Sequence, residues 1–191
     1  HRAMLRRRFL PLWLLLFVGL EPALAELRSL TILHTNDLHA RLTPDGRQRG
    51  GFAYLATALR RERAGCDSCL LLNGGDLVQG SPVSTIYRGL PIYDIANLLG
   101  LDVSTLGNHE FDYGWRQIPE FLRRARFPVV SANVVDQRGR LMAPAAYTIR
   151  TVNGIRVALI GALTADLPHL SMPDLLGPWR ALPVVETVRR Y

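Results

Sequence analysis

Three short clusters of polar residues hold the side chains in this chain that could do chemistry. They are segments 37–39 (DLH), 74–76 (GGD) and 108–112 (NHEFD). Carboxylate, amide and imidazole groups together suit divalent cations such as zinc and manganese, and an imidazole can also transfer a proton. The three clusters therefore predict half of a two-metal hydrolase centre.

A short apolar run precedes each cluster. These runs are residues 30–33, 70–72 and 103–106, and helical patterns flank them, as expected for buried strands of a parallel sheet. Ligand-binding residues in such sheets gather at the carboxyl ends of the strands. We therefore expect the three clusters to meet at one edge of a parallel sheet.

The first two clusters supply candidate metal ligands. Residues two apart in an extended segment point to the same side, so Asp37 and His39 can bind one ion. Asp76 follows two glycines that allow a sharp turn, and its two oxygens can bridge two cations about 3.5 to 4 Å apart. Each cluster alone has a simpler interpretation, because an exposed loop pair or a turn-closing aspartate would show the same pattern.

The third cluster supplies one candidate ligand and a proton-transfer pair. Asn108 and His109 are neighbours and point to different sides, so Asn108 can offer its amide oxygen to a metal while His109 faces a substrate. Asp112 can accept a hydrogen bond from the His109 ring and favour its charged form. A charged His109 could stabilise phosphoryl oxygens or protonate the leaving oxygen. A helix-capping loop is the alternative, and the role of Glu110 stays open.

Longer segments around these clusters resemble a known family. Segments 33–39 (LHTNDLH), 74–81 (GGDLVQGS) and 108–114 (NHEFDYG) resemble the calcineurin-like metallophosphoesterases. Within that family they are similar to the secreted bacterial branch of 5′-nucleotidases and 2′,3′-cyclic phosphodiesterases. The resemblance implies an α/β fold, the amino-terminal half of a four-layer α/β/β/α sandwich with mixed sheets.

The resemblance also implies a role for each site residue. Two divalent metal ions, zinc or manganese, would be bound, and a metal-bound hydroxide would attack the phosphoester. The implied metal ligands are Asp37, His39, Asp76 and Asn108. His109 and Asp112 would form the catalytic pair facing the substrate. The implied substrates are nucleoside 5′-monophosphates or related small nucleotides.

The resemblance is incomplete after His109. The family carries later histidine blocks that complete the second metal shell and a carboxyl-terminal domain that binds the nucleotide, and neither pattern occurs here. His169 stands without a partner histidine. We therefore expect residues 26–191 to form part of a metallophosphoesterase domain that is inactive alone. The alternatives are a thiosulfohydrolase on the same scaffold, against which the pairing of His109 with Asp112 argues, and an inactive metal-binding remnant.

The remaining pattern predicts helices alternating with strands. Apolar residues at helical spacing predict helices over residues 52–64, 92–99 and 115–126. Ser81 and Pro82 supply a cap and a first residue for another helix. Apolar runs predict further strands over residues 128–133, 147–152 and 155–162. Asn153 and Gly154 between the last two are a strong hairpin signal.

Residues 1–25 have the pattern of a signal peptide. A basic region at residues 6–8 is followed by an apolar stretch at 9–20 and by the small-residue site Ala-Leu-Ala at 23–25. The apolar stretch is shorter than the about 20 residues that span a bilayer, and no later segment comes close to that length. We expect an exported protein, periplasmic or extracellular, with no transmembrane segment after signal removal. The export route and oligomeric state stay open.

The composition is that of a globular protein. Of the 191 residues, 48% are hydrophobic and 20% are charged. The formal net charge of +7 would fall to +4 on removal of residues 1–25. The charge balance therefore does not indicate a nucleic acid partner.

Cys66 and Cys69 are the two cysteines of the sequence, spaced as Cys-x-x-Cys before the second expected strand. In an oxidising compartment this spacing favours a local disulfide. A structural zinc site usually needs four ligands, so we assign the pair no metal and no catalytic role.

Overall fold

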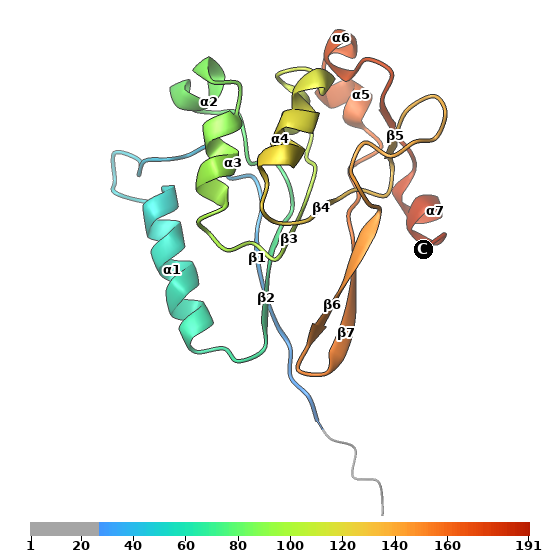
Figure 1. The fold of residues 1–191 in the computed structure, drawn as a ribbon. Coiled ribbons are helices and arrows are strands. Elements are labelled where there is room, and N and C mark those ends of the chain that lie inside the picture. The colour runs from blue at the N-terminus through green and yellow to red at the C-terminus, as the bar shows by residue number, and fades with distance from the viewer. Residues whose placement is uncertain (1–26) are drawn as a thin grey trace, which may run out of the picture.

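The computed structural model describes residues 27–191, which fold around a parallel sheet of four strands (Figure 1). In spatial order the strands are β1 (Thr31–Thr35), β2 (Cys69–Asn73), β3 (Val103–Thr105) and β4 (Val129–Val130). The prediction of parallel strands before each polar cluster is confirmed. The predicted signal peptide lies outside the described residues.

Helices connect the parallel strands, because a parallel pair cannot be joined by a tight turn. They are α1 (Phe52–Ala64), α2 (Pro82–Ile86), α3 (Leu90–Ala96) and α4 (Ile118–Arg124). The bounds of α1 match the prediction. Ser81 caps α2 as predicted, since its side chain accepts the backbone N–H of Ser84 at 3.3 Å and Pro82 is the first helical residue.

The other two predicted helices begin differently. α3 starts at Leu90 rather than at residue 92, with Pro91 in its first turn, where a missing N–H is harmless. The segment predicted as a helix from residue 115 begins with the 3₁₀ turn η2 (Trp115–Gln117) and becomes α-helical at Ile118. Pro119 explains the change, because proline fits the first turn of an α-helix but not its interior.

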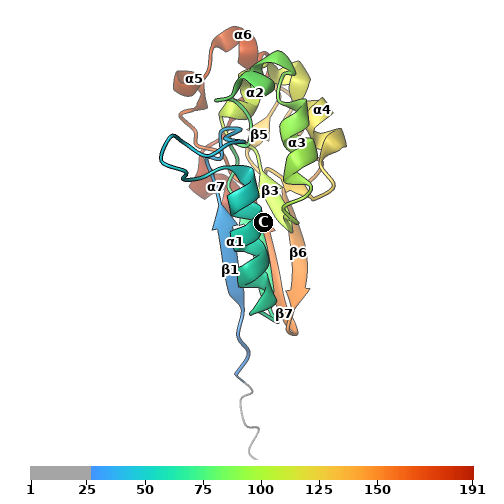
Figure 2. The same cartoon turned by 90° about the vertical axis from the view of Figure 1, so that its left-hand side faces the viewer.

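The helices bury one face of the sheet. Leu71 and Leu106 are fully buried in one cluster with Tyr93 of α3 and Phe121 of α4. The rings of Tyr93 and Phe121 stack with their centroids 4.7 Å apart. In Figure 2, α3 and α4 lie together to one side of β1. This packing fixes the strands whose carboxyl ends carry the polar clusters.

The predicted strand over residues 128–133 is wrong beyond Val130. The backbone N–H of Ser131 donates to Ala145, and that of Ala132 donates to Gly161, so the chain leaves the parallel ladder. The hairpin is confirmed as β6 (Tyr147–Val152) paired antiparallel with β7 (Ile155–Ile160).

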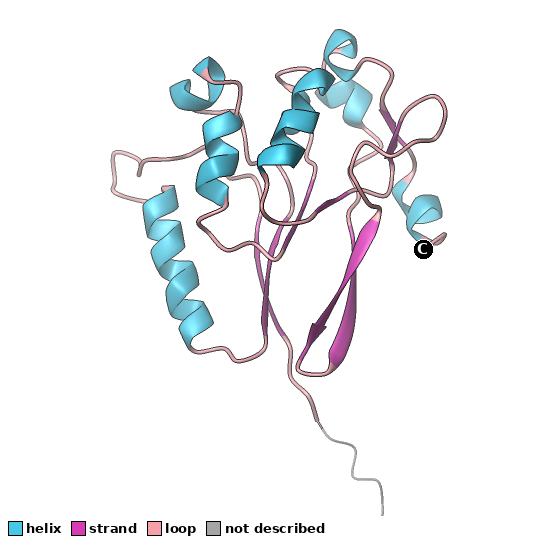
Figure 3. Ribbon diagram, viewed as in Figure 1, coloured by secondary structure: helices cyan, strands magenta, loops and turns pink. Residues whose placement is uncertain are grey.

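The carboxyl-terminal part adds further short elements. Strands β5 (Val134–Val135) and β8 (Arg180–Ala181) form an antiparallel pair. The short helices are α5 (Leu167–Leu170), α6 (Pro173–Leu176) and α7 (Val184–Val188). Helices α2, α5 and α6 gather at the end of the molecule toward which β1 and β2 run (Figure 3). No helix within residues 27–191 has the length and apolarity to cross a membrane.

The predicted disulfide is present. Cys66 and Cys69 are bonded to each other at the start of β2. The bond closes the turn between α1 and β2, so it lies at the end of the sheet opposite the polar clusters.

Candidate metal centre

The loops after β1 and β2 run side by side past the ends of their strands. Three backbone hydrogen bonds join them, from Asp37 N–H to Gly75 O at 3.3 Å, His39 N–H to Asp76 O at 3.0 Å and Ala40 N–H to Leu77 O at 2.8 Å. The first polar cluster is thereby held against the second. The first two polar clusters therefore lie next to each other at the sheet edge, as the sequence predicted.

The backbone of both loops has an unusual conformation. Asp37, His39 and Asp76 have φ angles of 53°, 45° and 55°. Non-glycine residues adopt this left-handed region at a cost of about 1–3 kcal/mol, and such residues concentrate at functional sites. The expectation that segment 37–39 is extended is therefore wrong. The side chains still converge, because Asp37 Oδ1 lies 3.6 Å from His39 Nε2.

The loops after β2 and β3 touch through their glycines. A Cβ atom on Gly75, whose φ is 98°, would lie 2.5 Å from the backbone nitrogen of Gly107. A Cβ atom on Gly107 would lie 2.1 Å from Asp76 Oδ1. Both distances are shorter than real contacts allow, so only glycine fits at either position.

Three predicted site residues form a group with the chemistry of a metal site. His39, Asp76 and His109 each offer a ligand atom, and these atoms all lie within 4.8 Å of one another. The rings of His39 and His109 meet edge to face, with centroids 4.7 Å apart. The backbone N–H of His109 donates to Asp76 Oδ1 at 2.9 Å. Two imidazoles and a carboxylate fit a borderline divalent cation.

His109 lies between this group and Asp112. Its Nδ1 is 2.7 Å from Asp112 Oδ2, which is the hydrogen bond the sequence predicted. Burial lowers the pKa of His109, but the hydrogen bond and the charge of Asp112 outweigh it, so the pKa is raised. The ring nitrogen left for a cation or a substrate is Nε2. The sequence placed His109 outside the metal ligands, whereas the structure brings it into the same group.

The two aspartates of the first and second clusters have opposite pKa shifts. Burial raises the pKa of Asp76, although the N–H of His109 opposes the shift. A hydrogen bond from the Asn36 side chain lowers the pKa of Asp37, which stays exposed. A cation between these carboxylates would relieve the cost of burying Asp76 in its charged form.

The remaining predictions for single residues concern Asn108 and His169. Asn108 is half-buried at the start of the 3₁₀ turn η1 (His109–Phe111), directly before the grouped His109. Its role as a ligand stays a prediction. His169 lies exposed on α5, as expected for a histidine without a site role.

Glu110 is the residue at this site whose role the sequence left open. It is fully buried, and its carboxylate accepts the backbone N–H groups of Gly107 at 2.6 Å, Leu77 at 2.9 Å and Asp76 at 3.0 Å. Burial and the nearby charge of Asp76 raise the pKa of Glu110 to about 7. Spacing could not have revealed this contact, because it joins loops that are distant in the sequence.

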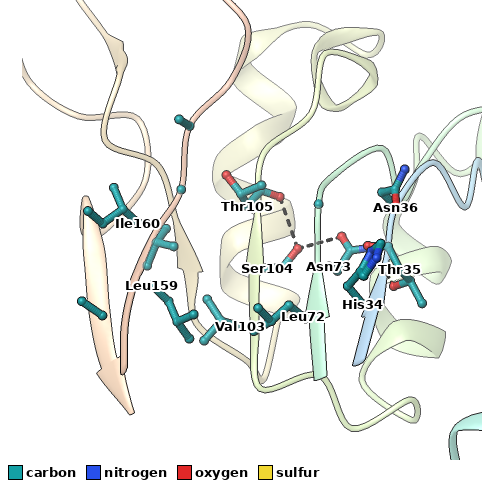
Figure 4. Close-up of a pocket in the computed structure, with 15 residues that line it drawn as sticks. His34, Thr35, Asn36, Leu72, Asn73, Val103, Ser104, Thr105, Leu159 and Ile160 are labelled. Atoms are coloured by element: carbon teal, nitrogen blue, oxygen red, sulfur yellow. Dashed lines mark hydrogen bonds between the residues drawn. The ribbon is translucent and has the colours of Figure 1, made fainter. Parts of the chain in front are cut away.

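Asn73 was also missed, and it ties the strand ends together. Its Nδ2 donates to Thr35 Oγ1 at 3.1 Å, while its Oδ1 accepts from Ser104 Oγ at 2.9 Å and from the N–H of Gly75 at 3.0 Å. Figure 4 shows Asn73 between Thr35 and Ser104, on a cavity of about 580 Å³. The signal in the sequence that could have identified Asn73 is its position directly after the apolar run 70–72.

Comparison with known proteins agrees with this geometry. Residues 30–159 match the family described as calcineurin-like phosphoesterase. The 5′-nucleotidase of Rattus norvegicus is 38% identical over 182 residues, which cover 85% of this chain and 31% of the rat protein.

The solved structures that resemble this chain also include a 5′-nucleotidase. The 5′-nucleotidase precursor from Thermus thermophilus superposes with a TM-score of 0.74 at 35% identity, covering 84% of this chain and 33% of that chain. The sulfate thiohydrolase SoxB from Thermus thermophilus has a TM-score of 0.75 at 19% identity, covering 86% and 41%. The latter identity supports a shared fold only. This chain spans about a third of the length of the two nucleotidases.

Proposed function

Because this chain belongs to the calcineurin-like phosphoesterase family, we propose that it carries part of a metal centre that hydrolyses phosphoesters of small nucleotides. The observation that carries the proposal is the convergence of His39, Asp76 and His109 within 4.8 Å. The similarity to proteins described as 5′-nucleotidases supports nucleotide monophosphates as the substrate class.

The residues present fit a divalent cation. His39 and Asp76 would hold it, with Asp37 beside His39 and with Asn108 as a further ligand on the neighbouring loop. When bound, zinc or manganese would supply positive charge to the phosphoryl oxygens and activate a water molecule for in-line attack. Asp37, His39 and Asp76 have positive φ angles, a conformation that concentrates at functional sites.

His109, oriented by Asp112, would protonate the leaving oxygen and stabilise the negative charge on the phosphoryl oxygens. Asp112 holds the ring through Nδ1, so Nε2 can face the phosphoryl group. The raised pKa of His109 favours a ring that donates a hydrogen bond or a proton to the leaving oxygen. Asp112 would act through His109 and fix its orientation.

We propose that binding two ions requires ligands in addition to His39, Asp76 and His109. Within residues 27–191 the candidate metal-binding group, which is His39, Asp76 and His109, offers two imidazoles and one carboxylate, whereas a pair of ions requires three or more ligands each. We therefore expect residues 26–191 to bind metal but not to turn over substrate alone.

We also propose export from the cytoplasm. The basic and apolar pattern of residues 1–25 supports it, as does the Cys66–Cys69 disulfide, since disulfides persist in oxidising compartments. Fusing residues 1–25 to a reporter that is active only outside the cytoplasm tests this proposal. Reporter activity is expected, and a reporter retained in the cytoplasm would contradict export.

Metal binding and substrate chemistry test the proposed function together. Calorimetric titration with Mn²⁺ should give saturable binding that Asp76→Asn weakens strongly, while Asp45→Asn, in the loop before α1, should bind as the unaltered chain does. Absence of saturable binding would contradict the proposal. Phosphate release from adenosine monophosphate by the chain alone would overturn the expectation of inactivity, and sulfate release from a thiosulfate conjugate would favour the thiosulfohydrolase alternative.

A further inference from the structure

Glu110 is a buried carboxylate to which the proposed chemistry gives no role. It belongs to the one-turn helix η1 and follows Asn108 and His109 directly. Its side chain is fully buried, where a charged or polar group is unfavourable unless it is hydrogen-bonded. Three backbone N–H groups satisfy the carboxylate, and two of them lie more than 30 residues away in the sequence.

These hydrogen bonds join two of the three loops that carry His39, Asp76 and His109. One oxygen, Oε2, accepts both from Asp76 N–H at 3.0 Å in the loop after β2 and from Gly107 N–H at 2.6 Å in the loop after β3. The other oxygen accepts from Leu77 N–H at 2.9 Å. A single side chain therefore sets the distance between the two backbones.

The connection continues to the ligand atoms themselves. Asp76 Oδ1 accepts the N–H of His109 at 2.9 Å, and His109 is the residue next to Glu110. Glu110, Asp76 and His109 thus close a ring of hydrogen bonds. Within this ring the Asp76 carboxylate cannot shift relative to the His109 backbone without breaking the hydrogen bond from the His109 N–H.

We propose that Glu110 is a positioning residue that holds Asp76 in metal-binding geometry, with His109 beside it, before the metal arrives. Glu110 acts through the backbones of the two loops and not through contact with the ion. The consequence for metal affinity rests on the proposed function, whereas the holding of the loops does not. The chemistry also explains the residue type, because a carboxylate has two acceptor oxygens and no donor to oppose three N–H groups.

Asp136 provides a matched control for a merely structural carboxylate. It is 4% exposed, and its Oδ1 accepts the N–H groups of Arg138 and Arg140, each at 2.9 Å. These bonds lie within a single turn after β5 and touch none of the polar clusters. Asp136→Asn therefore removes the same kind of interaction at a place unconnected with the metal-binding group.

Mn²⁺ titration of the chain with either substitution separates positioning from general stability. Glu110→Gln keeps the size of the side chain but turns one acceptor into a donor that faces an N–H group. We expect the dissociation constant for Mn²⁺ to rise about 10- to 100-fold, the range found when the partners of metal ligands are lost. Asp136→Asn should lower the melting temperature and leave the dissociation constant unchanged. An unchanged constant in Glu110→Gln, or an equal rise in both variants, would overturn the proposal.

Hydrogen exchange in the unaltered chain gives a second test that needs no variant to fold. The N–H groups of Leu77 and Gly107 should exchange slowly in the metal-free chain, because Glu110 already holds them. Fast exchange that slows only after a divalent cation is added would overturn the proposal, since the cation would then be what orders the loops. If the chain binds no Mn²⁺ at all, the proposed function fails, and the exchange rates still decide whether Glu110 holds the loops.

Discussion

Replacing Gly107 by alanine adds one methyl group where the second and third polar clusters touch. Its Cβ would lie 2.1 Å from Asp76 Oδ1, 2.7 Å from Asp76 Cγ and 2.5 Å from the Asp76 backbone nitrogen. The carboxylate could rotate away from the methyl group, but the backbone nitrogen can move only with the whole loop after β2. Either response displaces Asp76 from His39 and His109.

The cost of Gly107→Ala follows from these contacts. Inserting a methylene-sized group into a closely packed region costs about 1–3 kcal/mol. Displacing Asp76 also breaks the bond from the His109 N–H, and a hydrogen bond to a charged group contributes about 1.5–3 kcal/mol. Because both losses relieve the same clash, we expect a decrease of about 3 kcal/mol in the free energy of unfolding. For a domain of this size that is a fall in melting temperature of about 6–12 °C.

Gly46→Ala is the matched control, since it makes the same chemical change in open space. No atom lies within 4 Å of a Cβ built on Gly46. Urea denaturation should show a change in unfolding free energy within about 0.5 kcal/mol for this variant, and Mn²⁺ affinity should fall in Gly107→Ala alone. The reasoning is refuted if the two variants are equally stable and bind Mn²⁺ equally well.

Three further predictions concern other contacts. Asp112→Asn removes the carboxylate that raises the pKa of His109, so an NMR titration of the metal-free chain should give a lower pKa in the variant; an equal or higher value would contradict the assignment. Replacing Cys66 and Cys69 by serine should lower the unfolding free energy by about 2 kcal/mol, the value for a loop this short, as measured by urea denaturation. The pKa of Asp136 is lowered because hydrogen bonds from its own turn outweigh the effect of burial, so its stabilising effect should be present at neutral pH and disappear as the pH falls below about 4. An Asp136→Asn stability deficit that persists in acid would contradict this.

The sequence predicted the parts of the site that depend on strand order. A polar cluster directly after an apolar run places its residues at the carboxyl edge of a parallel sheet, and His39, Asp76 and His109 do meet there. The helix over residues 52–64 was also predictable, because its apolar positions recur at helical spacing over three turns. Both signals are local and repeat along the chain.

The parts that the sequence did not predict depend on contacts between distant segments. The left-handed backbone of Asp37 and His39 has no local signal, because both residues usually adopt extended or helical conformations. Strands β5 and β8 have two residues each, too few for a periodic pattern. The burial of Glu110 follows from the approach of two loops, and a glutamate after a histidine would otherwise be interpreted as an exposed residue.

Anomalous diffraction from crystals soaked with zinc or manganese tests the central claim most directly, because it locates the ion without reference to activity. We expect a peak about 2.0–2.2 Å from ligand atoms of His39 and Asp76, with the His109 ring beside it. Clear density for these side chains with no anomalous peak between them, or a peak only elsewhere on the protein, would contradict it.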